Sequence, residues 1–217
     1  MFKAQKTVYI VRHGQSVDNV LPVFQKSTSL LSEKGKCQAQ QIAERLKYLD
    51  FEILVSSPLP RAKETAEAIS SVSGKPIELS ELFVERIKPS STDGKPWTNS
   101  EAVKIFRDWE KSLVQTGLKV EDGENFEEIF HRADRALDYL LERSESNIVV
   151  ISHGHFIRTL IARILIGDRV DGEIARRFYD LTSLENTAIT VIQYREAFEE
   201  SACWRVWTLN DHAHFAE

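Results

Sequence analysis

The chain is poor in cysteine: only Cys37 and Cys203 occur among 217 residues, and they form no CxxC motif. This excludes a disulfide framework and a zinc ribbon. No apolar run reaches the roughly 20 residues that a transmembrane helix needs. The N-terminal segment lacks the apolar core of a signal peptide, and there are no repeats, low-complexity tracts or Gly/Ser-rich linkers. We therefore expect a soluble, cytoplasmic protein with no membrane partner.

Neither sign of charge is in strong excess. Lys and Arg number 28 and Asp and Glu 33, which gives a net charge of −5. This balance argues against a nucleic-acid partner, although it leaves room for a small basic pocket. With 42% hydrophobic and 28% charged residues, the composition is typical of a globular protein. A chain of this length can bury enough apolar surface to fold without a structural metal. The length favours a single domain over residues 1–217.

Strand-like and helix-like patterns alternate along the chain. Short runs of β-branched and aromatic residues predict strands at 7–11, 53–55, 148–151, 187–194 and 204–209. Apolar residues at three- and four-residue steps predict a helix that Ser32 can cap, with its apolar face over 39–49, and further helices over 102–113 and 126–141. Another helix is expected after Ser57, with Pro58 at its first position and Gly74 and Pro76 at its end. This alternation predicts an α/β fold, a three-layer α/β/α sandwich with a mostly parallel central sheet.

The stretch 75–99 shows the weakest pattern and holds three of the six prolines. We expect it to form an irregular excursion over the active site at one end of the sheet, where functional loops tend to lie.

Basic residues follow three predicted strands directly. The segments are Val11-Arg12-His13-Gly14, Ser57-Pro58-Leu59-Pro60-Arg61 and Ser152-His153-Gly154-His155. Ligands of open α/β sheets bind beyond the carboxyl ends of the strands, so Arg12, His13, Arg61 and His153 can converge there. Such a cluster needs an anion, and arginine matches phosphate oxygens through paired hydrogen bonds. The sequence therefore predicts a phosphate site that contains two histidines.

Simpler interpretations exist for each residue taken alone. Arg12 and Arg61 can form surface ion pairs, and His13 can be an ordinary histidine at a strand end. Three segments of the same design favour the phosphate site over these interpretations. For Glu124 and Arg132 we predict a structural pair or a helix-start contact, and for His212-Ala213-His214 a frayed polar tail.

The ordered motifs resemble those of the histidine phosphatase superfamily, the phosphoglycerate mutase-like proteins. The matching segments are Val11 to Ser16 with Asn19, Ser57 to Ala66, Glu85 at 24 residues after Arg61, and Ser152 to His155. By this resemblance His13 is the nucleophile, Arg12, Arg61 and His153 hold the phosphoryl group, and Glu85 is the proton donor. Asn19, Ser16 and Gly154 would be further phosphate or substrate contacts.

The resemblance implies a metal-independent phosphomonoesterase that works through a phosphohistidine on His13, with Glu85 as general acid and base. No metal and no cofactor are expected, because cationic side chains would stabilise the phosphoryl group. The substrate would be a small phosphorylated metabolite or a phosphopeptide. The chemistry agrees, since a neutral imidazole is a competent nucleophile near pH 7 and a departing alkoxide needs a proton.

The loops 24–29 and 86–94 depart from the family pattern, which leaves the substrate open. Lys26, Arg86, Lys88 and Lys95 could favour a substrate with extra negative charge, or could simply be solvated. Three alternatives remain: a cofactor-dependent phosphoglycerate mutase, an inactive phospholigand-binding scaffold, and a metallohydrolase. The last would use His153 and His155 with the histidine pair 212 and 214.

Overall fold

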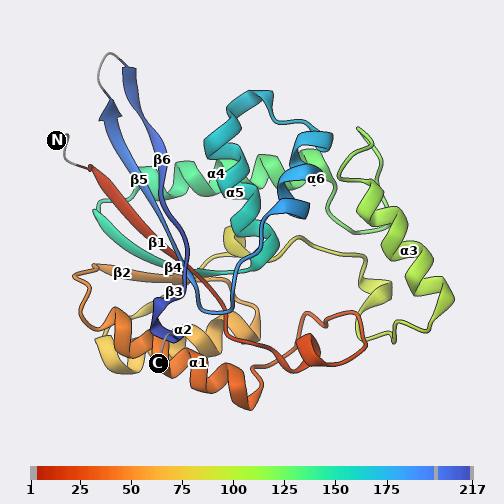
Figure 1. Cartoon of the computed structure of the whole chain (residues 1–217), viewed down its shortest axis with the longest axis horizontal. Helices are drawn as coiled ribbons and strands as arrows, with labels where there is room; N and C mark the ends of the chain where they lie inside the picture. The colour runs from red at the N-terminus through yellow and green to blue at the C-terminus, as the bar shows by residue number, and fades with distance from the viewer. Residues whose placement is uncertain (1–3, 198–199, 216–217) are drawn as a thin grey trace.

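The structure, a computed structural model, describes residues 4–197 and 200–215. Six strands form one sheet in the order β3-β2-β4-β1-β5-β6 (Figure 1). They are β1 (Lys6–Arg12), β2 (Ile53–Ser56), β3 (Ile77–Leu79), β4 (Asn147–Ser152), β5 (Ile189–Ala197) and β6 (Glu200–Asp211). Strands β3, β2, β4 and β1 are parallel, while β5 and β6 are antiparallel to their neighbours. The sheet is therefore mixed, with a parallel half that positions the predicted site.

Helices cover both faces of this sheet. On one face lie α1 (Glu33–Leu46) and α2 (Pro60–Ser73), and on the other α4 (Phe126–Glu142) and α5 (Gly154–Ile166) (Figure 1). Two more helices, α3 (Ser100–Lys111) and α6 (Gly172–Leu181), lie beyond one end of the sheet. The predicted three-layer α/β/α class is confirmed.

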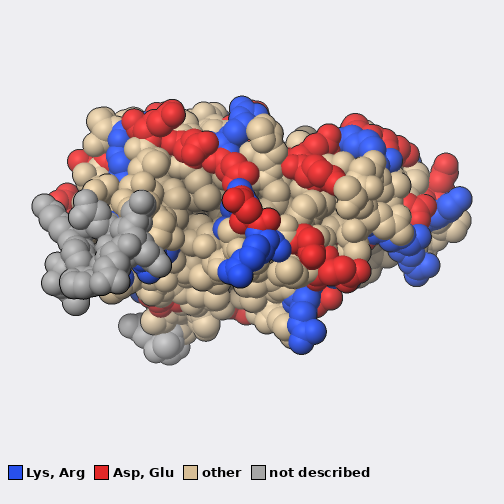
Figure 2. Space-filling view, turned by 90° about the horizontal axis from the view of Figure 1, so that it is seen from above, with Lys and Arg blue, Asp and Glu red and all other residues tan. Residues whose placement is uncertain are grey.

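Basic and acidic side chains are interspersed over the described surface on the face that Figure 2 shows. This agrees with the small net charge of the sequence. Among the residues that the structure describes, no helix combines the length and the apolar character needed to cross a bilayer.

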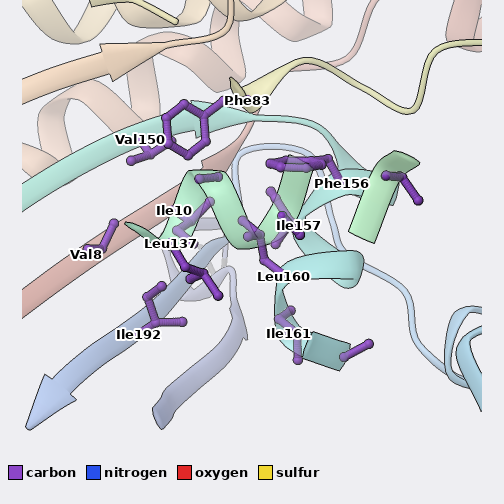
Figure 3. Close-up of a cluster of buried hydrophobic side chains, with 14 of the residues drawn as sticks. Val8, Ile10, Phe83, Leu137, Val150, Phe156, Ile157, Leu160, Ile161 and Ile192 are labelled. Atoms are coloured by element: carbon purple, nitrogen blue, oxygen red, sulfur yellow. The ribbon is translucent and has the colours of Figure 1, made fainter. Parts of the chain in front are cut away.

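The alternation of side chains in the strands builds two cores. Val8 and Ile10 of β1 pack with α4 and α5 in the cluster that Figure 3 shows, whereas Val11 packs with α1 and α2. All three are fully buried. Because successive side chains of a strand point to opposite faces, one short apolar run fills both layers.

The second predicted helix begins two residues later than expected. The prediction that Pro58 opens it was wrong: Pro60 stands at the first position, after an extended Leu59 (φ −63°, ψ 136°). A residue before proline avoids the helical conformation, so Leu59 cannot continue a helix from Pro58 into Pro60. The predicted end holds, because Gly74 caps the helix in the left-handed conformation, with φ 69°.

Several elements were not predicted from the sequence. The excursion 75–99 contains the edge strand β3 and two short 3₁₀ helices, η2 (Glu81–Phe83) and η3 (Ser90–Thr92). Helices α5 and α6 were also missed. In α5 the buried side chains Phe156, Ile157, Thr159, Leu160, Ile161 and Ala162 surround most of the axis, which weakens the amphipathic signal.

Candidate active site

The three basic segments meet at the carboxyl edge of the parallel strands. Strand β4 lies between β1 and β2, with Arg12 opposite Ser152 and Ser56 opposite Ile151. The next residues of all three segments therefore leave the sheet side by side. Their side chains converge: the rings of His13 and His153 are 4.9 Å apart between centroids.

His13 has one defined tautomer. Its Nδ1 lies 2.6 Å from the carbonyl oxygen of Gly14, which can only accept, so Nδ1 carries the proton. Its Nε2 lies 3.2 Å from Nε of Arg61, which can only donate, so Nε2 holds the lone pair. Both contacts require the same neutral imidazole, with Nε2 as its nucleophilic atom.

The arginines around His13 donate to uncharged acceptors. Arg12 donates to the carbonyl oxygen of Leu184, and Arg61 donates to His13 and to the carbonyl oxygen of Lys26 at 3.4 Å. Neither arginine forms an ion pair with a carboxylate of the described residues. Nε of Arg12 and Nδ1 of His153 are buried and have no hydrogen-bond partner in the described part of the chain. Buried polar atoms of this kind are costly, and an oxyanion is the kind of group that can accept from such donors.

Burial controls the protonation of these groups. It lowers the pKa of His13 well below 6.5, and the charges of Arg61 and Arg12 lower it further. Burial and then Arg61 lower the pKa of His153 in the same way. For Arg61 burial lowers the pKa to about 10, and the nearby Glu85 carboxylate opposes this change. Both histidines are thus neutral at pH 7 beside two charged arginines.

These shifts predict that the protein loses stability in mild acid. His13, His153 and His155 all have a pKa well below 6.5, first because of burial. Below about pH 6.5 the unfolded chain takes up protons that the folded chain does not, so the free energy of unfolding falls as pH falls. For three histidines the slope reaches up to about 4 kcal/mol per pH unit.

Urea denaturation at pH values from about 7 down to about 5 measures this slope. The variant His155→Phe is expected to reduce it by roughly a third, because one of the three groups is removed. A free energy of unfolding that stays constant over this range in the unmodified protein would contradict the account.

Glu85 lies beside this cluster, after η2. Its carboxylate accepts hydrogen bonds from the backbone N–H groups of Phe156 and Arg86, both at 3.0 Å, and of His155 at 3.3 Å. It therefore caps the first turn of α5, next to His153. Its charge also acts on both Arg12 and Arg61. The acidic side chain that the resemblance selected is thus close to both arginines.

Arg132 fixes the backbone of the Glu85 segment. Its guanidinium donates to the carbonyl oxygens of Leu82, Val84 and Glu85, at 3.0, 2.9 and 3.3 Å. Its Nη2 lies 2.6 Å from the Glu124 carboxylate, in the structural pair that the sequence predicted. Besides forming this pair, Arg132 holds the irregular segment that carries Glu85.

Other buried groups orient the two histidines. Ser57 Oγ lies 2.8 Å from Nε2 of His153, and Nδ2 of Asn186 donates to the carbonyl oxygen of His13 at 2.9 Å. Thr65 Oγ1 accepts from the N–H of Gly14 at 3.1 Å and donates to the carbonyl oxygen of Arg61 at 2.8 Å. These roles were missed, although Ser57 and Thr65 lie within a segment that the resemblance covers.

The three weaker site predictions have different outcomes. Asn19 is exposed and lines a cavity beside the cluster, so it is accessible to a substrate bound there. Ser16 is fully buried and its hydroxyl accepts a hydrogen bond from Nε2 of Gln25. It therefore positions the side chain of Gln25. Gly154 makes room for Arg12, since a Cβ there would lie 3.2 Å from Nε of that arginine.

The cavity has a volume of about 720 Å³, and both Arg61 and Glu85 line it. Its rim combines the two loops that depart from the family pattern. The N–H of Phe24 donates to the carbonyl oxygen of Lys95, and the N–H of Gly94 to that of Phe24, both at 2.9 Å. Ser27 Oγ also donates to Asp93, at 3.0 Å. The two loops that depart from the family pattern are thus hydrogen-bonded to each other.

A group of three or more His, Cys, Asp or Glu side chains able to hold a metal does not occur within residues 4–197 and 200–215. The histidine pairs considered for a metallohydrolase have other contacts. His153 is bonded to Ser57, and His214 lies 3.0 Å from Nη1 of Arg45 and 3.1 Å from Oγ1 of Thr187. The predicted frayed tail is instead anchored, in part through the ion pair of Arg45 with Asp211.

Comparison with known proteins gives a consistent result. A sequence model of the histidine phosphatase superfamily (branch 1) matches residues 8–206. A Citrobacter koseri protein named probable phosphoglycerate mutase GpmB is 31% identical over 215 residues, which are 95% of this chain and 94% of that protein. Its Escherichia coli counterpart is 29% identical over 212 residues, with the same shares covered.

Solved structures share the fold. A mutant phosphoserine phosphatase from Entamoeba histolytica, in complex with phosphoserine, superposes with a TM-score of 0.74 at 24% identity, over 96% of this chain and 98% of that one. A mycobacterial glucosyl-3-phosphoglycerate phosphatase complexed with VO3 gives 0.73 at 22% identity, over 95% and 99%. Together with the match over residues 8–206, these findings confirm the predicted resemblance: the chain belongs to the histidine phosphatase superfamily, branch 1.

Proposed function

We propose that this protein is a metal-independent phosphomonoesterase that works through a phosphohistidine on His13. The observation that carries the proposal is the tautomer of His13, whose Nε2 lone pair faces Arg61 beside buried cationic side chains. A neutral, oriented imidazole beside anion-binding groups is suited to attack phosphorus.

In the first step the phosphate of the ester takes the place of His13 Nε2 as the partner of Arg61. Arg12, Arg61 and His153 hold its oxygens. Nε2 then forms a bond to phosphorus as the bond from phosphorus to the ester oxygen breaks. Glu85 enters this step in its acid form and transfers its proton to the departing oxygen, which leaves Glu85 as a carboxylate. In the second step the Glu85 carboxylate removes a proton from water, which attacks phosphorus and breaks the bond to Nε2. Inorganic phosphate leaves and His13 is neutral again.

Chelation and vanadate test this mechanism. Hydrolysis of phosphate monoesters is expected to survive EDTA, because cationic side chains stabilise the transferring group. Orthovanadate is expected to inhibit, because it imitates the five-coordinate transition state. Loss of activity on chelation, restored by a divalent ion, would contradict the proposal and favour a metallohydrolase.

Phosphoglycerate mutase activity is the second candidate, favoured by the names of the 29% and 31% identical relatives. A mutase returns the phosphoryl group to a second substrate hydroxyl, whereas a phosphatase transfers it to water. Incubation with 3-phosphoglycerate and a bisphosphoglycerate primer separates the two, since a mutase yields 2-phosphoglycerate faster than inorganic phosphate. A catalytically inactive scaffold, the third candidate, would give neither product.

A further inference from the structure

The cavity beside the phosphate cluster has an aromatic wall. Phe24 and Phe106 lie 4.8 Å apart between ring centroids, and Phe106 and Trp109 lie 5.2 Å apart. Trp97 adds a fourth aromatic side chain to the lining and is 58% exposed. A wall of neighbouring aromatic side chains favours a flat apolar group of the ligand.

The cations of the cavity are largely neutralised. Arg86 is paired with Glu110 at 3.2 Å, and Lys88 with Asp93. The hypothesis that Arg86 and Lys88 attract extra negative charge is therefore not supported. Carboxylates outnumber cations in the lining, where Asp18, Glu81, Glu85, Asp93, Glu110 and Asp122 face Lys26, Arg61, Arg86 and Lys88. Beyond the phosphate cluster, an anionic leaving group would meet like charge.

One polar atom at the cavity has no partner. His155 lines the cavity, and its ring packs on Tyr179 with 4.3 Å between ring centroids. Its backbone N–H donates to Glu85. Its Nε2 is buried and forms no hydrogen bond to the described residues. Burial and the charges of Arg86 and Arg158 lower its pKa well below 6.5, so the ring is neutral at pH 7. A neutral ring nitrogen suits a neutral hydrogen-bonding group such as a hydroxyl.

We propose that this cavity binds the leaving group of the phosphate ester, and that this group is an uncharged alcohol carrying a flat ring and a hydroxyl that bonds to His155. The inference rests on the proposed phosphatase function and names its substrate class. The aromatic side chains would hold the ring, and Nε2 of His155 would orient it beside Glu85.

Two esters that both leave through a primary alkoxide test the class. Benzyl phosphate is expected to have a kcat/KM at least about tenfold above that of 2-phosphoglycolate, which has a carboxylate in place of the ring. Equal values, or a preference for 2-phosphoglycolate, would overturn this inference while the phosphatase function stands. Failure to hydrolyse any phosphate ester would overturn the phosphatase function, and this inference with it.

The aromatic wall is tested at its exposed member. Trp97→Ala is expected to lower the ratio of the two kcat/KM values, benzyl phosphate over 2-phosphoglycolate, by several fold. The control is Trp207→Ala: Trp207 is 52% exposed on β6, contacts Arg195 and does not line the cavity, so the ratio should not change. Equal ratios in the two variants would overturn the role of the wall.

His155→Phe keeps a ring on Tyr179 and removes Nε2. In the unmodified protein, at least one of the three ring isomers of hydroxymethyl-benzyl phosphate is expected to have a lower KM than benzyl phosphate. In His155→Phe that difference should vanish. A difference in KM that survives the substitution, or the absence of any preferred isomer in the unmodified protein, would overturn the role of His155.

Discussion

His13→Ala is expected to lower kcat for hydrolysis of any phosphate monoester by at least about 10³-fold. The reason is that Nε2 of His13 is the atom that attacks phosphorus, and the neighbouring Arg12, Arg61 and His153 can bind phosphate but cannot replace it as nucleophile. Steady-state release of inorganic phosphate measures the effect.

The matched control is His131→Ala, because His131 is exposed on α4 and lies outside the cluster. It should keep full activity. Thermal unfolding of both variants shows whether His13→Ala is folded, since His13 is only 2% exposed and packs against His153. A folded His13→Ala protein that retains a large part of the activity would contradict the nucleophile assignment.

Glu85→Gln is expected to lower kcat for alkyl phosphates by about 10²–10⁴-fold, the usual contribution of general acid catalysis. An alkoxide is a poor leaving group and depends on the proton that Glu85 supplies. Nitrophenyl phosphate leaves as a stable phenolate, so its first step should be slowed much less. Water attack still needs Glu85 as base, and its rate should fall for both esters.

The decisive readout is therefore the pre-steady-state burst of nitrophenolate. In Glu85→Gln the burst should persist, followed by a slow steady state. Similar small losses on alkyl and aryl esters would remove Glu85 from the chemistry, and Glu81 or Asp93, which line the same cavity, would be tested next.

The convergence of the basic segments could be predicted from the sequence because it depends on strand order alone. Apolar runs before Arg12, Ser57 and His153 marked parallel strands, and parallel strands end at one edge of the sheet. The caps at Ser32 and Gly74 are local as well, and both were predicted correctly. The chemical roles of the converging residues stay predictions until the variants are measured.

Contacts between irregular segments that lie far apart in the chain could not be predicted from the sequence. Arg132 holds the carbonyl oxygens around Glu85, which lie about 50 residues earlier, and no periodicity signals such a bond. The pairing of Arg86 with Glu110 likewise neutralises a cation that, by its charge alone, could have favoured an anionic substrate. Charges can be counted in a sequence, but their neutralisation depends on tertiary structure.

The phosphorylated enzyme itself is the most direct test of the account. After brief mixing with a labelled phosphate ester and rapid quenching in alkali, the protein should carry phosphate that is stable to base and labile to acid, as expected of a phosphoramidate. Peptide mapping at alkaline pH should place it on His13, and His13→Ala should carry none. Phosphate that maps to another residue, or label that persists in His13→Ala, would contradict the central claim.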